Sequence, residues 1–447
     1  MPKFFGTDGI RAKAGEFPLA PRALFVLGRA LGQLLNNRLQ HTACALIGRD
    51  TRQSGEWIES ALAAGLQAAG AEVTSVGVIP TPGIAYLTGV GNFDVGIVIS
   101  ASHNPYEDNG IKIFAPSGRK LPETDESIIE AELLTGKLDT DEPALALLEP
   151  SQPLVERYFS FLHDEIAAGI SLIGIKLALD CANGAASAIA PHLFASLGAE
   201  VVTCGCTPDG RNINSQCGSL YMEKLQALVQ QEQCQLGIAF DGDADRALFV
   251  DEQGRLVDGD GVLFIIADHY LRNNQLDPKT VVATVMSNMG LEVGLRDRGI
   301  ELRRTAVGDK YVLDELLTCN GQLGGEQSGH IIFPKISLAG DGMITALQLL
   351  RVLVRQGQSL SILAGGFQSF PQILINIPVR NKPAFNTVPV IQAAVQDLES
   401  KLVNQGRLLL RYSGTENLAR IMIEGRDQRF INEEAQHLAD IIRQQLG

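Results

Sequence analysis

One structural unit recurs along the first three quarters of this 447-residue chain. A short apolar, β-branched run is followed by a polar or glycine-rich turn, and then by a segment whose apolar residues repeat with a period near 3.6. This order is typical of α/β folds, in which ligands bind where the strands of a sheet end. We therefore expect a functional site in the turns after these runs. The expected strands lie at 43–47, 93–99, 175–179, 236–240 and 281–285, and Ser54 is expected to cap the helix after the first of them.

A different order begins after Gly366. A strand, a helix, two strands around a turn and a final helix follow one another there, which is typical of a small α+β domain. Length alone predicts about three domains, at roughly 150 residues for each. Two further boundaries are expected, in the acidic, proline-containing stretch 138–153 and near Gly254.

The overall charge limits the partners. Lys and Arg number 37 against 51 Asp and Glu, a net charge of −14, which argues against a general binder of nucleic acid or of an anionic membrane. An anionic ligand would need a locally basic site. No apolar run has membrane-spanning length, the N-terminal residues do not form a secretory signal, and the seven cysteines are scattered without a C-x-x-C pair. We therefore expect a cytoplasmic protein with reduced thiols.

Three carboxylates stand on alternate residues after the run 236–240, at Asp241, Asp243 and Asp245 in the sequence D-G-D-A-D-R. Carboxylates this close raise one another's pKa unless a cation neutralises them, and an all-oxygen set favours a hard ion such as Mg²⁺. A solvated acidic turn is the alternative. An EF-hand calcium loop fits poorly because Arg246 stands where that loop requires glycine. Arg246 adds positive charge for an anion beside the metal.

Three further turns carry weaker signals. The sequence A-S-H-N-P at 101–105 contains Ser102, a candidate nucleophile, although these residue types are also ordinary in turns. The sequence G-G-E-Q-S-G-H at 324–330 offers a glutamate and a serine that can bind hydroxyl groups, whereas its histidine is better explained as structural. The sequence R-Y-S-G-T-E-N-L-A-R at 411–420 suits a phosphate, with a hairpin that carries surface arginines as the alternative.

Taken in order, the motifs of this chain resemble the α-D-phosphohexomutase superfamily. They are F-G-T-D-G-I-R at 5–11, G-R-D-T-R at 48–52, A-S-H-N-P at 101–105, N-G-I-K at 109–112, D-G-D-A-D-R at 241–246, V-G-D-K-Y-V at 307–312, G-E-Q-S-G-H at 325–330 and R-Y-S-G-T-E at 411–416. With Gln327 between Glu326 and Ser328, this motif resembles that of the glucosamine branch of the superfamily.

The resemblance implies an α/β fold with three related mixed-sheet domains and a smaller C-terminal α+β domain around a central cleft. The implied boundaries are 1–150 for the domain with the catalytic serine, 151–254 for the metal-binding loop, 255–366 for the sugar-binding loop and 367–447 for the phosphate-binding domain.

The resemblance also implies residue roles. Ser102 bears a phosphoryl group, and this group together with Asp241, Asp243 and Asp245 holds one Mg²⁺ per chain. The implied catalytic residues beside it are Lys112, Arg11 and Arg246, and which of them is the general acid or base stays open. The implied substrate-binding residues are Glu326, Ser328, His330, Lys310, Arg411, Ser413, Gly414, Thr415 and Arg420.

The implied reaction interconverts glucosamine 6-phosphate and glucosamine 1-phosphate. Phosphorylated Ser102, which the reaction requires, donates its group to form glucosamine 1,6-bisphosphate, an intermediate and activator that returns its other phosphate to the serine. The product would supply UDP-N-acetylglucosamine for the cell envelope. A phosphosugar is the implied partner, and a homodimer is left open. Three alternatives remain: a mutase for mannose or glucose phosphates, a metal-dependent phosphatase with Asp241 as nucleophile, and a non-catalytic sugar-phosphate sensor.

Overall fold

The computed structural model describes residues 4–6, 8–135, 146–403, 405–413 and 417–447. The chain divides into two compact units. The larger unit joins Met1–Met286 with Gly299–Gly365, and the smaller unit joins Ser287–Arg298 with Gly366–Gly447.

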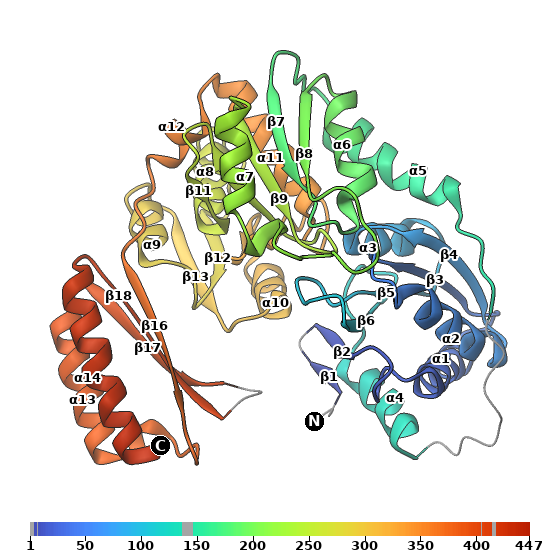
Figure 1. Ribbon diagram of the computed structural model, residues 1–447, viewed down its shortest axis with the longest axis horizontal. Coiled ribbons are helices and arrows are strands. Elements are labelled where there is room, and N and C mark those ends of the chain that lie inside the picture. The colour runs from blue at the N-terminus through green and yellow to red at the C-terminus, as the bar shows by residue number, and fades with distance from the viewer. Residues whose placement is uncertain (1–3, 7, 136–145, 404, 414–416) are drawn as a thin grey trace. The chain divides into compact units, whose positions relative to one another are not determined.

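The first sheet of the larger unit has the strand order β1-β2-β6-β5-β3-β4. Strands β3, β4 and β5 are parallel, whereas β6 and β2 are antiparallel to their neighbours. Helices α1 and α2 cover one face and α3 lies on the other (Figure 1). The bounds are β1 Phe5–Gly6, β2 Gly9–Lys13, α1 Pro21–Asn36, β3 Cys44–Arg49, α2 Gly55–Ala68, β4 Glu72–Val78, α3 Thr81–Val90, β5 Val95–Ile99, β6 Asp108–Phe114 and α4 Glu123–Thr135.

Two glycines let α1 and α2 cross in close contact. A Cβ atom on Gly28 would lie 2.2 Å from the carbonyl oxygen of Leu62, and one on Gly65 would lie 2.1 Å from that of Phe25. The helix pair can therefore press one continuous apolar surface onto the sheet, with the strand residues at alternate positions facing it.

Two further mixed sheets complete the larger unit. Their orders are β11-β10-β9-β7-β8 and β13-β12-β14-β15. Leu225 and Val229 of α7 pack on the first of these sheets, and Val312 and Leu316 of α10 pack on the second. The bounds are α5 Gln152–Ser160, η1 Phe161–Ile166, β7 Lys176–Asp180, α6 Ala186–Ser196, β8 Glu200–Cys204, η2 Gly218–Leu220, α7 Glu223–Gln231, β9 Leu236–Phe240, β10 Ala247–Asp251, β11 Leu256–Val257, α8 Gly259–Arg272, β12 Thr280–Thr284, β13 Glu301–Thr305, α10 Asp309–Cys319, β14 Gly324–Gly325, β15 Ile331–Ile332, α11 Gly342–Gln356 and α12 Leu360–Ala364.

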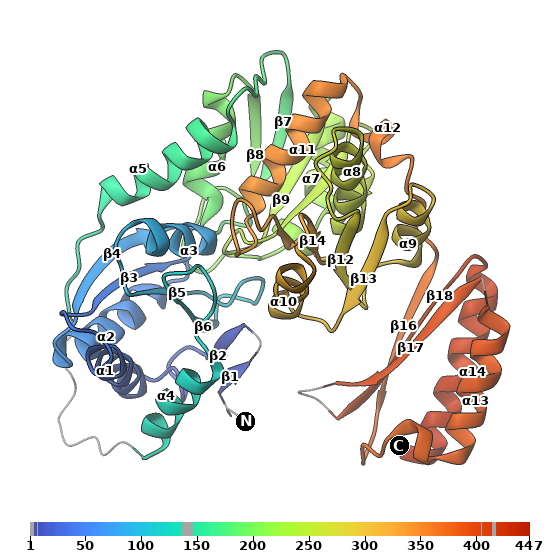
Figure 2. The same cartoon turned by 180° about the vertical axis from the view of Figure 1, so that it is seen from behind.

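The smaller unit is an antiparallel sheet in the order β16-β18-β17 with two helices on one face (Figure 2). The apolar residues of α14, spaced at Ile431, Ala435, Leu438 and Ile442, are buried against it, as their helical period predicts. The bounds are α9 Met289–Arg296, β16 Gln372–Pro378, η3 Phe385–Thr387, α13 Pro389–Leu402, β17 Gly406–Tyr412, β18 Leu418–Gly425 and α14 Gln428–Leu446.

The predicted fold class is confirmed, with mixed α/β sheets followed by the order strand, helix, strand, strand, helix after Gly366. One detail is wrong. Ser54 precedes α2, but its side chain makes no capping hydrogen bond and instead accepts one from Asn109 at 2.8 Å. Among the described residues, no helix combines the length and apolar character needed to cross a bilayer.

Candidate active site and metal centre

Three buried carboxylates meet in the loop that follows β9. One oxygen atom each from Asp241, Asp243 and Asp245 lies within 4.8 Å of the others. Glycine is required inside this loop, because a Cβ atom on Gly242 would lie 2.5 Å from the carbonyl oxygen of Ser102. The sequence-predicted triad and the sequence-predicted serine are therefore brought into contact. We call residues 241–246 the metal loop.

The charges of the metal loop are not balanced by hydrogen bonds alone. Burial, together with Asp245 and Asp243, raises the pKa of Asp241 well above its usual range. One buried oxygen of Asp243, Oδ1, has no hydrogen-bond partner among the described residues. An orphaned buried oxygen within an all-carboxylate set is the donor chemistry that a hard divalent cation needs. The residues therefore fit a metal site.

Ser102 lies in the turn after β5 and is almost fully buried. Its Oγ donates a hydrogen bond to Oδ2 of Asp241 at 2.6 Å. The residue has a φ of 51°, a left-handed conformation that is strained for serine and is common at functional sites. His103 beside it lies 3.3 Å from the hydroxyl, and burial and the nearby Arg246 lower the pKa of His103 to about 4, so this imidazole is neutral at pH 7.

Arg52 holds the Ser102 turn in place. Its guanidinium is fully buried, pairs with the carboxylate of Asp50 at 2.9 Å and donates hydrogen bonds to backbone carbonyl groups. A planar guanidinium with five donors can hold several such groups at once. The motif G-R-D-T-R gave no reason to assign this role from sequence, because the acceptors are about fifty residues away. They are the carbonyl oxygens of Ser102, Asn104, Pro105 and Asp108.

Lys112 of β6 offsets part of the negative charge of the triad. Its Nζ lies 2.9 Å from Oδ2 of Asp243, 3.1 Å from Oδ2 of Asp245 and 3.0 Å from Oδ2 of Asp8. Burial opposes the ammonium form, but these three carboxylates raise the pKa of Lys112 well above its usual range. Lys112 therefore carries a proton at neutral pH in this arrangement.

The two predicted arginines lie close to the same groups. Nη2 of Arg11 is 2.6 Å from Oδ2 of Asp8, and the backbone N–H of Arg246 donates to Oδ1 of Asp241 at 3.2 Å. Nη1 of Arg246 lies 3.3 Å from Nδ1 of His103, beside the Ser102 turn. These arginines therefore place positive charge beside the carboxylates of the metal loop.

The predicted sugar-binding residues divide into two groups. Glu326 accepts hydrogen bonds from the backbone N–H of Gly308 at 3.1 Å and from the Ser328 hydroxyl at 3.5 Å, so the loops 307–312 and 325–330 are joined. Lys310, in contrast, forms an ion pair with Glu123 of α4 and is partly exposed.

His330 lies beside the metal loop. Its Nδ1 is 3.6 Å from Oδ1 of Asp245, and its Nε2 is 4.0 Å from Oδ2 of Asp309. Burial opposes its protonation, but Asp245 and Asp309 together raise the pKa of His330 to about 9. The sequence favoured a structural histidine, whereas the geometry gives a charged one near the metal loop.

Thr81 was not found from the sequence. Its hydroxyl donates to Oδ2 of Asp243 at 2.5 Å, and its backbone N–H donates to the Asp243 carbonyl oxygen at 3.0 Å. It therefore fixes the middle residue of the triad from the start of α3. The sequence around it, I-P-T-P at 79–82, is an ordinary turn and carries no signal for this contact.

In the smaller unit, Arg411 and Arg420 lie directly opposite one another on β17 and β18. Burial and the neighbouring Arg420 lower the pKa of Arg411. Like charges at opposed positions of a sheet destabilise it by up to ~1 kcal/mol, so an anion placed on them would be favoured.

The turn between these strands is only partly within the described residues. Ser413 is buried, and its carbonyl oxygen accepts a hydrogen bond from Nζ of Lys382 at 2.9 Å. Lys382 was not predicted and adds a third cation beside the turn. The predicted residues Gly414 and Thr415 lie outside the described residues.

Comparison with known proteins agrees with this arrangement. Four domain families match the chain, namely phosphoglucomutase/phosphomannomutase alpha/beta/alpha domain I at residues 2–139, domain II at 156–254, domain III at 258–370 and the C-terminal domain at 374–441. Phosphoglucosamine mutase from Syntrophotalea carbinolica is 46% identical over 448 residues, which cover 100% of this chain and 98% of the relative.

The chain belongs to the phosphoglucosamine mutase family of the α-D-phosphohexomutase superfamily. The resemblance inferred from the motifs is thus confirmed.

Solved structures of the superfamily share the fold. A phosphoglucomutase/phosphomannomutase family protein from Burkholderia thailandensis superposes with a TM-score of 0.79 at 24% identity, covering 99% of this chain and 98% of that one. Aspergillus fumigatus N-acetylphosphoglucosamine mutase, solved in complex with GlcNAc-6P and magnesium, has a TM-score of 0.66 at 18% identity and covers 99% and 96%.

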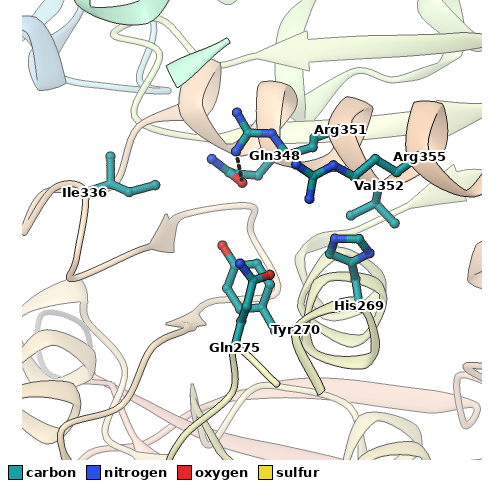
Figure 3. Close-up of a pocket in the computed structure, with 8 residues that line it drawn as sticks. All are labelled: His269, Tyr270, Gln275, Ile336, Gln348, Arg351, Val352 and Arg355. Carbon is teal, nitrogen blue, oxygen red and sulfur yellow. Dashed lines mark hydrogen bonds between the residues drawn. The ribbon is translucent and has the colours of Figure 1, made fainter. Parts of the chain in front are cut away.

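A separate cavity of about 150 Å³ lies between α8 and α11 (Figure 3). His269 and Tyr270 line it from α8, and Arg351 and Arg355 line it from α11. None of the residues that the sequence predicts for the phosphoglucosamine mutase site lines this cavity, and no carboxylate does. It is therefore distinct from the metal loop.

Proposed function

We propose that this chain is a phosphoglucosamine mutase that interconverts glucosamine 6-phosphate and glucosamine 1-phosphate. One observation carries the proposal. The Ser102 hydroxyl donates to Asp241 at 2.6 Å, so the candidate phosphoryl carrier and the candidate metal site occupy one buried place. Relatives at 44–46% identity over essentially the whole chain bear the same name, which supports the reaction.

Ser102 carries the phosphoryl group in this proposal, and its phosphorylation is required for activity. A phosphoserine bears about −1.5 to −2 charges and would be placed beside three carboxylates, so cations have to neutralise it. Asp241, Asp243, Asp245 and the Ser102 phosphoryl group hold one Mg²⁺ per chain. Mg²⁺ bound there supplies the positive charge that stabilises the equatorial oxygens during transfer.

The three nearby cationic residues have different parts. Lys112 carries a proton because neighbouring carboxylates raise its pKa, and a metal bound to Asp243 and Asp245 would lower that pKa again, so that the proton could pass to a reacting oxygen. Arg11 and Arg246 supply fixed charge, since a guanidinium does not lose its proton in proteins. Lys112 is therefore our choice for the general acid, and by reversibility for the base of the return step.

The remaining predicted residues bind the sugar and the phosphate that is not being transferred. Glu326 and Ser328 form hydrogen bonds with sugar hydroxyl groups, and His330 and Lys310 take part in binding the phosphosugar. The second phosphate is held by Arg411, Ser413, Gly414, Thr415 and Arg420. Glucosamine 1,6-bisphosphate is the intermediate and activator, and it reorients between the two transfers, with a hinge near Gly365.

The proposal includes a localisation and a use for the product. We place the protein in the cytoplasm, where its product would feed UDP-N-acetylglucosamine synthesis for the cell envelope. The three domain boundaries at 150, 254 and 366, and a homodimer, stay predictions.

A coupled assay tests the proposal. Purified protein is given Mg²⁺, glucosamine 1,6-bisphosphate and either glucosamine 6-phosphate, glucose 6-phosphate or mannose 6-phosphate, with released phosphate measured in parallel. We expect preferred isomerisation of glucosamine 6-phosphate with negligible phosphate release. A clear preference for an unaminated hexose would overturn the substrate assignment, and stoichiometric phosphate release would favour a phosphatase with Asp241 as nucleophile.

A further inference from the structure

Two thiols lie at the ends of neighbouring strands, next to the metal loop. Strands β7 and β8 are parallel and in register, with Asp180 opposite Cys204. Cys181 follows β7 directly, and Cys206 follows β8 after one glycine. The two turns are joined, because the backbone N–H of Asn183 donates to the carbonyl oxygen of Gly205 at 2.5 Å.

Of the four cysteines in this region, Cys181, Cys204, Cys206 and Cys217, only Cys206 has a lowered pKa. Its Sγ donates a hydrogen bond to the carbonyl oxygen of Cys204 at 3.2 Å. Its contact with Cys181 lowers the pKa of Cys206 in spite of burial, and the same contact raises that of Cys181. Burial raises the pKa of Cys204 to about 12 and that of Cys217 to about 11. Cys206 is also partly exposed, whereas Cys181 is fully buried. A partly exposed thiol with a lowered pKa beside a buried second thiol is the arrangement of an oxidisable pair.

The turn that carries Cys181 supports the metal loop. The backbone N–H of Ala185 donates to the carbonyl oxygen of Gly242 at 2.8 Å. A Cβ atom on Gly184 would lie 2.2 Å from that same oxygen, so the two loops are in direct contact. Two consecutive residues of the turn, Ala182 and Asn183, have φ values of 54° and 48° and hold a strained left-handed backbone. A displacement of Cys181 would therefore be felt at Gly242, between two of the three carboxylates.

We propose that Cys181 and Cys206 form a disulfide under peroxide, and that this bond weakens divalent-cation binding at the metal loop. The Cys206 thiolate attacks hydrogen peroxide, forming an S–O bond while the O–O bond breaks and hydroxide leaves. The Cys181 sulfur then displaces hydroxide from the Cys206 sulfenic acid, and its proton leaves in water. Two thiols are oxidised and one peroxide is reduced to two waters. The coupling half of this proposal rests on the proposed metal site.

Peptide mapping tests the bond. The full-length protein is treated with hydrogen peroxide, blocked with a thiol reagent, digested without reduction and analysed by mass spectrometry. We expect a cross-link between the Cys181 and Cys206 peptides that dithiothreitol removes and that Cys206→Ser lacks. Cys44→Ser, which alters a partly exposed thiol on β3, should form the cross-link as the wild type does. Cross-links only among other cysteines, or oxidation of Cys206 without a partner, would overturn the proposal.

A second measurement tests the coupling without using activity. Thermal unfolding is followed while MgCl₂ alone is added to reduced protein, to oxidised protein and to both variants. We expect the apparent Kd for Mg²⁺ to rise at least fivefold on oxidation of the wild type and of Cys44→Ser, and to stay unchanged for Cys206→Ser. A disulfide that leaves this Kd unchanged would overturn the coupling alone. Reduced protein without any Mg²⁺ shift would overturn the metal site and the coupling together, while the cross-link is judged by its peptides.

Discussion

The metal loop of the larger unit and the arginine pair of the smaller unit hold charge in opposite ways. In the first, three carboxylates are buried together and are fixed by Lys112, Thr81 and the Ser102 turn. In the second, Arg411 and Arg420 oppose one another on two strands of a small sheet. The first region gathers anionic groups and favours a cation, and the second places cationic groups opposite one another and favours an anion.

This difference separates the region suited to the chemical step from the region suited to binding a phosphate. Groups that react need fixed positions, and the metal loop is tied to several elements of the larger unit. Groups that only hold a phosphate need charge and donors, which two arginines on a hairpin supply. We therefore expect changes in the first region to lower kcat and changes in the second to raise KM.

Ser102→Ala should give the largest effect. It removes the atom that accepts the phosphoryl group, so kcat should fall by on the order of 10³-fold or more, while sugar-phosphate binding measured by calorimetry persists. Ser127→Ala, which changes an exposed serine on α4, is the matched control and should be fully active. Residual mutase activity above about a tenth of the wild type would contradict the covalent mechanism.

Asp341, a buried acid next to the metal loop, should make the folding stability depend on pH. It caps α11 and accepts a hydrogen bond from the Tyr158 hydroxyl at 2.7 Å, and burial raises its pKa to about 6. The unfolded chain, with the ordinary value of 3.8, loses this proton first as pH rises, so folded-state stability falls between about pH 4 and pH 6. At 1.36 kcal/mol per pKa unit, this fall is worth up to about 3 kcal/mol.

Asp341→Asn should remove that fall, because asparagine can keep both the cap and the tyrosine contact without titrating. Urea unfolding with EDTA at several pH values compares the two proteins. The wild type should lose stability relative to the variant from pH 4 to pH 6, with no further change above. If the wild type instead gained stability relative to the variant from pH 4 to pH 6, the folded protein would favour the ionised carboxylate of Asp341, and its pKa would be lowered rather than raised.

Arg52→Lys should lower kcat by about 10- to 100-fold with KM nearly unchanged, because lysine keeps the charge but cannot hold four carbonyl groups of the Ser102 turn. Arg52 acts through the turn as a positioning residue, so the split between kcat and KM is the informative measurement. Arg443→Lys on the exposed face of α14 serves as its control. An equal loss in Arg443→Lys, or a change in KM alone, would argue against the positioning role.

Arg411→Gln should have the smallest effect, and this effect should appear in KM rather than in kcat. KM for glucosamine 6-phosphate should rise about tenfold and kcat should change little, since one charge-assisted contact to phosphate is lost. Because the substitution also relieves the repulsion from Arg420, the melting temperature should not fall. Arg443→Gln controls for the loss of a surface charge. A large drop in kcat would place Arg411 with the reacting groups and break the contrast between the two regions.

The sequence was informative wherever local pattern decides structure. Apolar runs, turns and helical periods predicted the α/β units and the α+β ending, and carboxylates on alternate residues after a buried strand predicted the triad. These signals lie within ten or so neighbouring residues, so they can be read without knowing the fold.

Contacts between distant segments could not be predicted in this way. Ser102 and Asp241 are 139 residues apart, and Arg52 and Thr81 act on turns far along the chain. Ser54 shows the same limit, because its hydroxyl accepts a hydrogen bond from Asn109 of β6 and does not cap the helix that follows it. His330 looked structural in isolation, and its pKa is raised by Asp245 and Asp309, which folding places beside it.

The most direct test of the account follows the phosphoryl group itself. Protein equilibrated with glucosamine 1,6-bisphosphate whose phosphates carry an isotopic label, and with Mg²⁺, is digested and mapped by mass spectrometry, before and after a chase with unlabelled glucosamine 6-phosphate. We predict labelled phosphate on Ser102, which the sugar phosphate removes and replaces during turnover. Phosphate on Asp241, or turnover with Ser102 never phosphorylated, would contradict it.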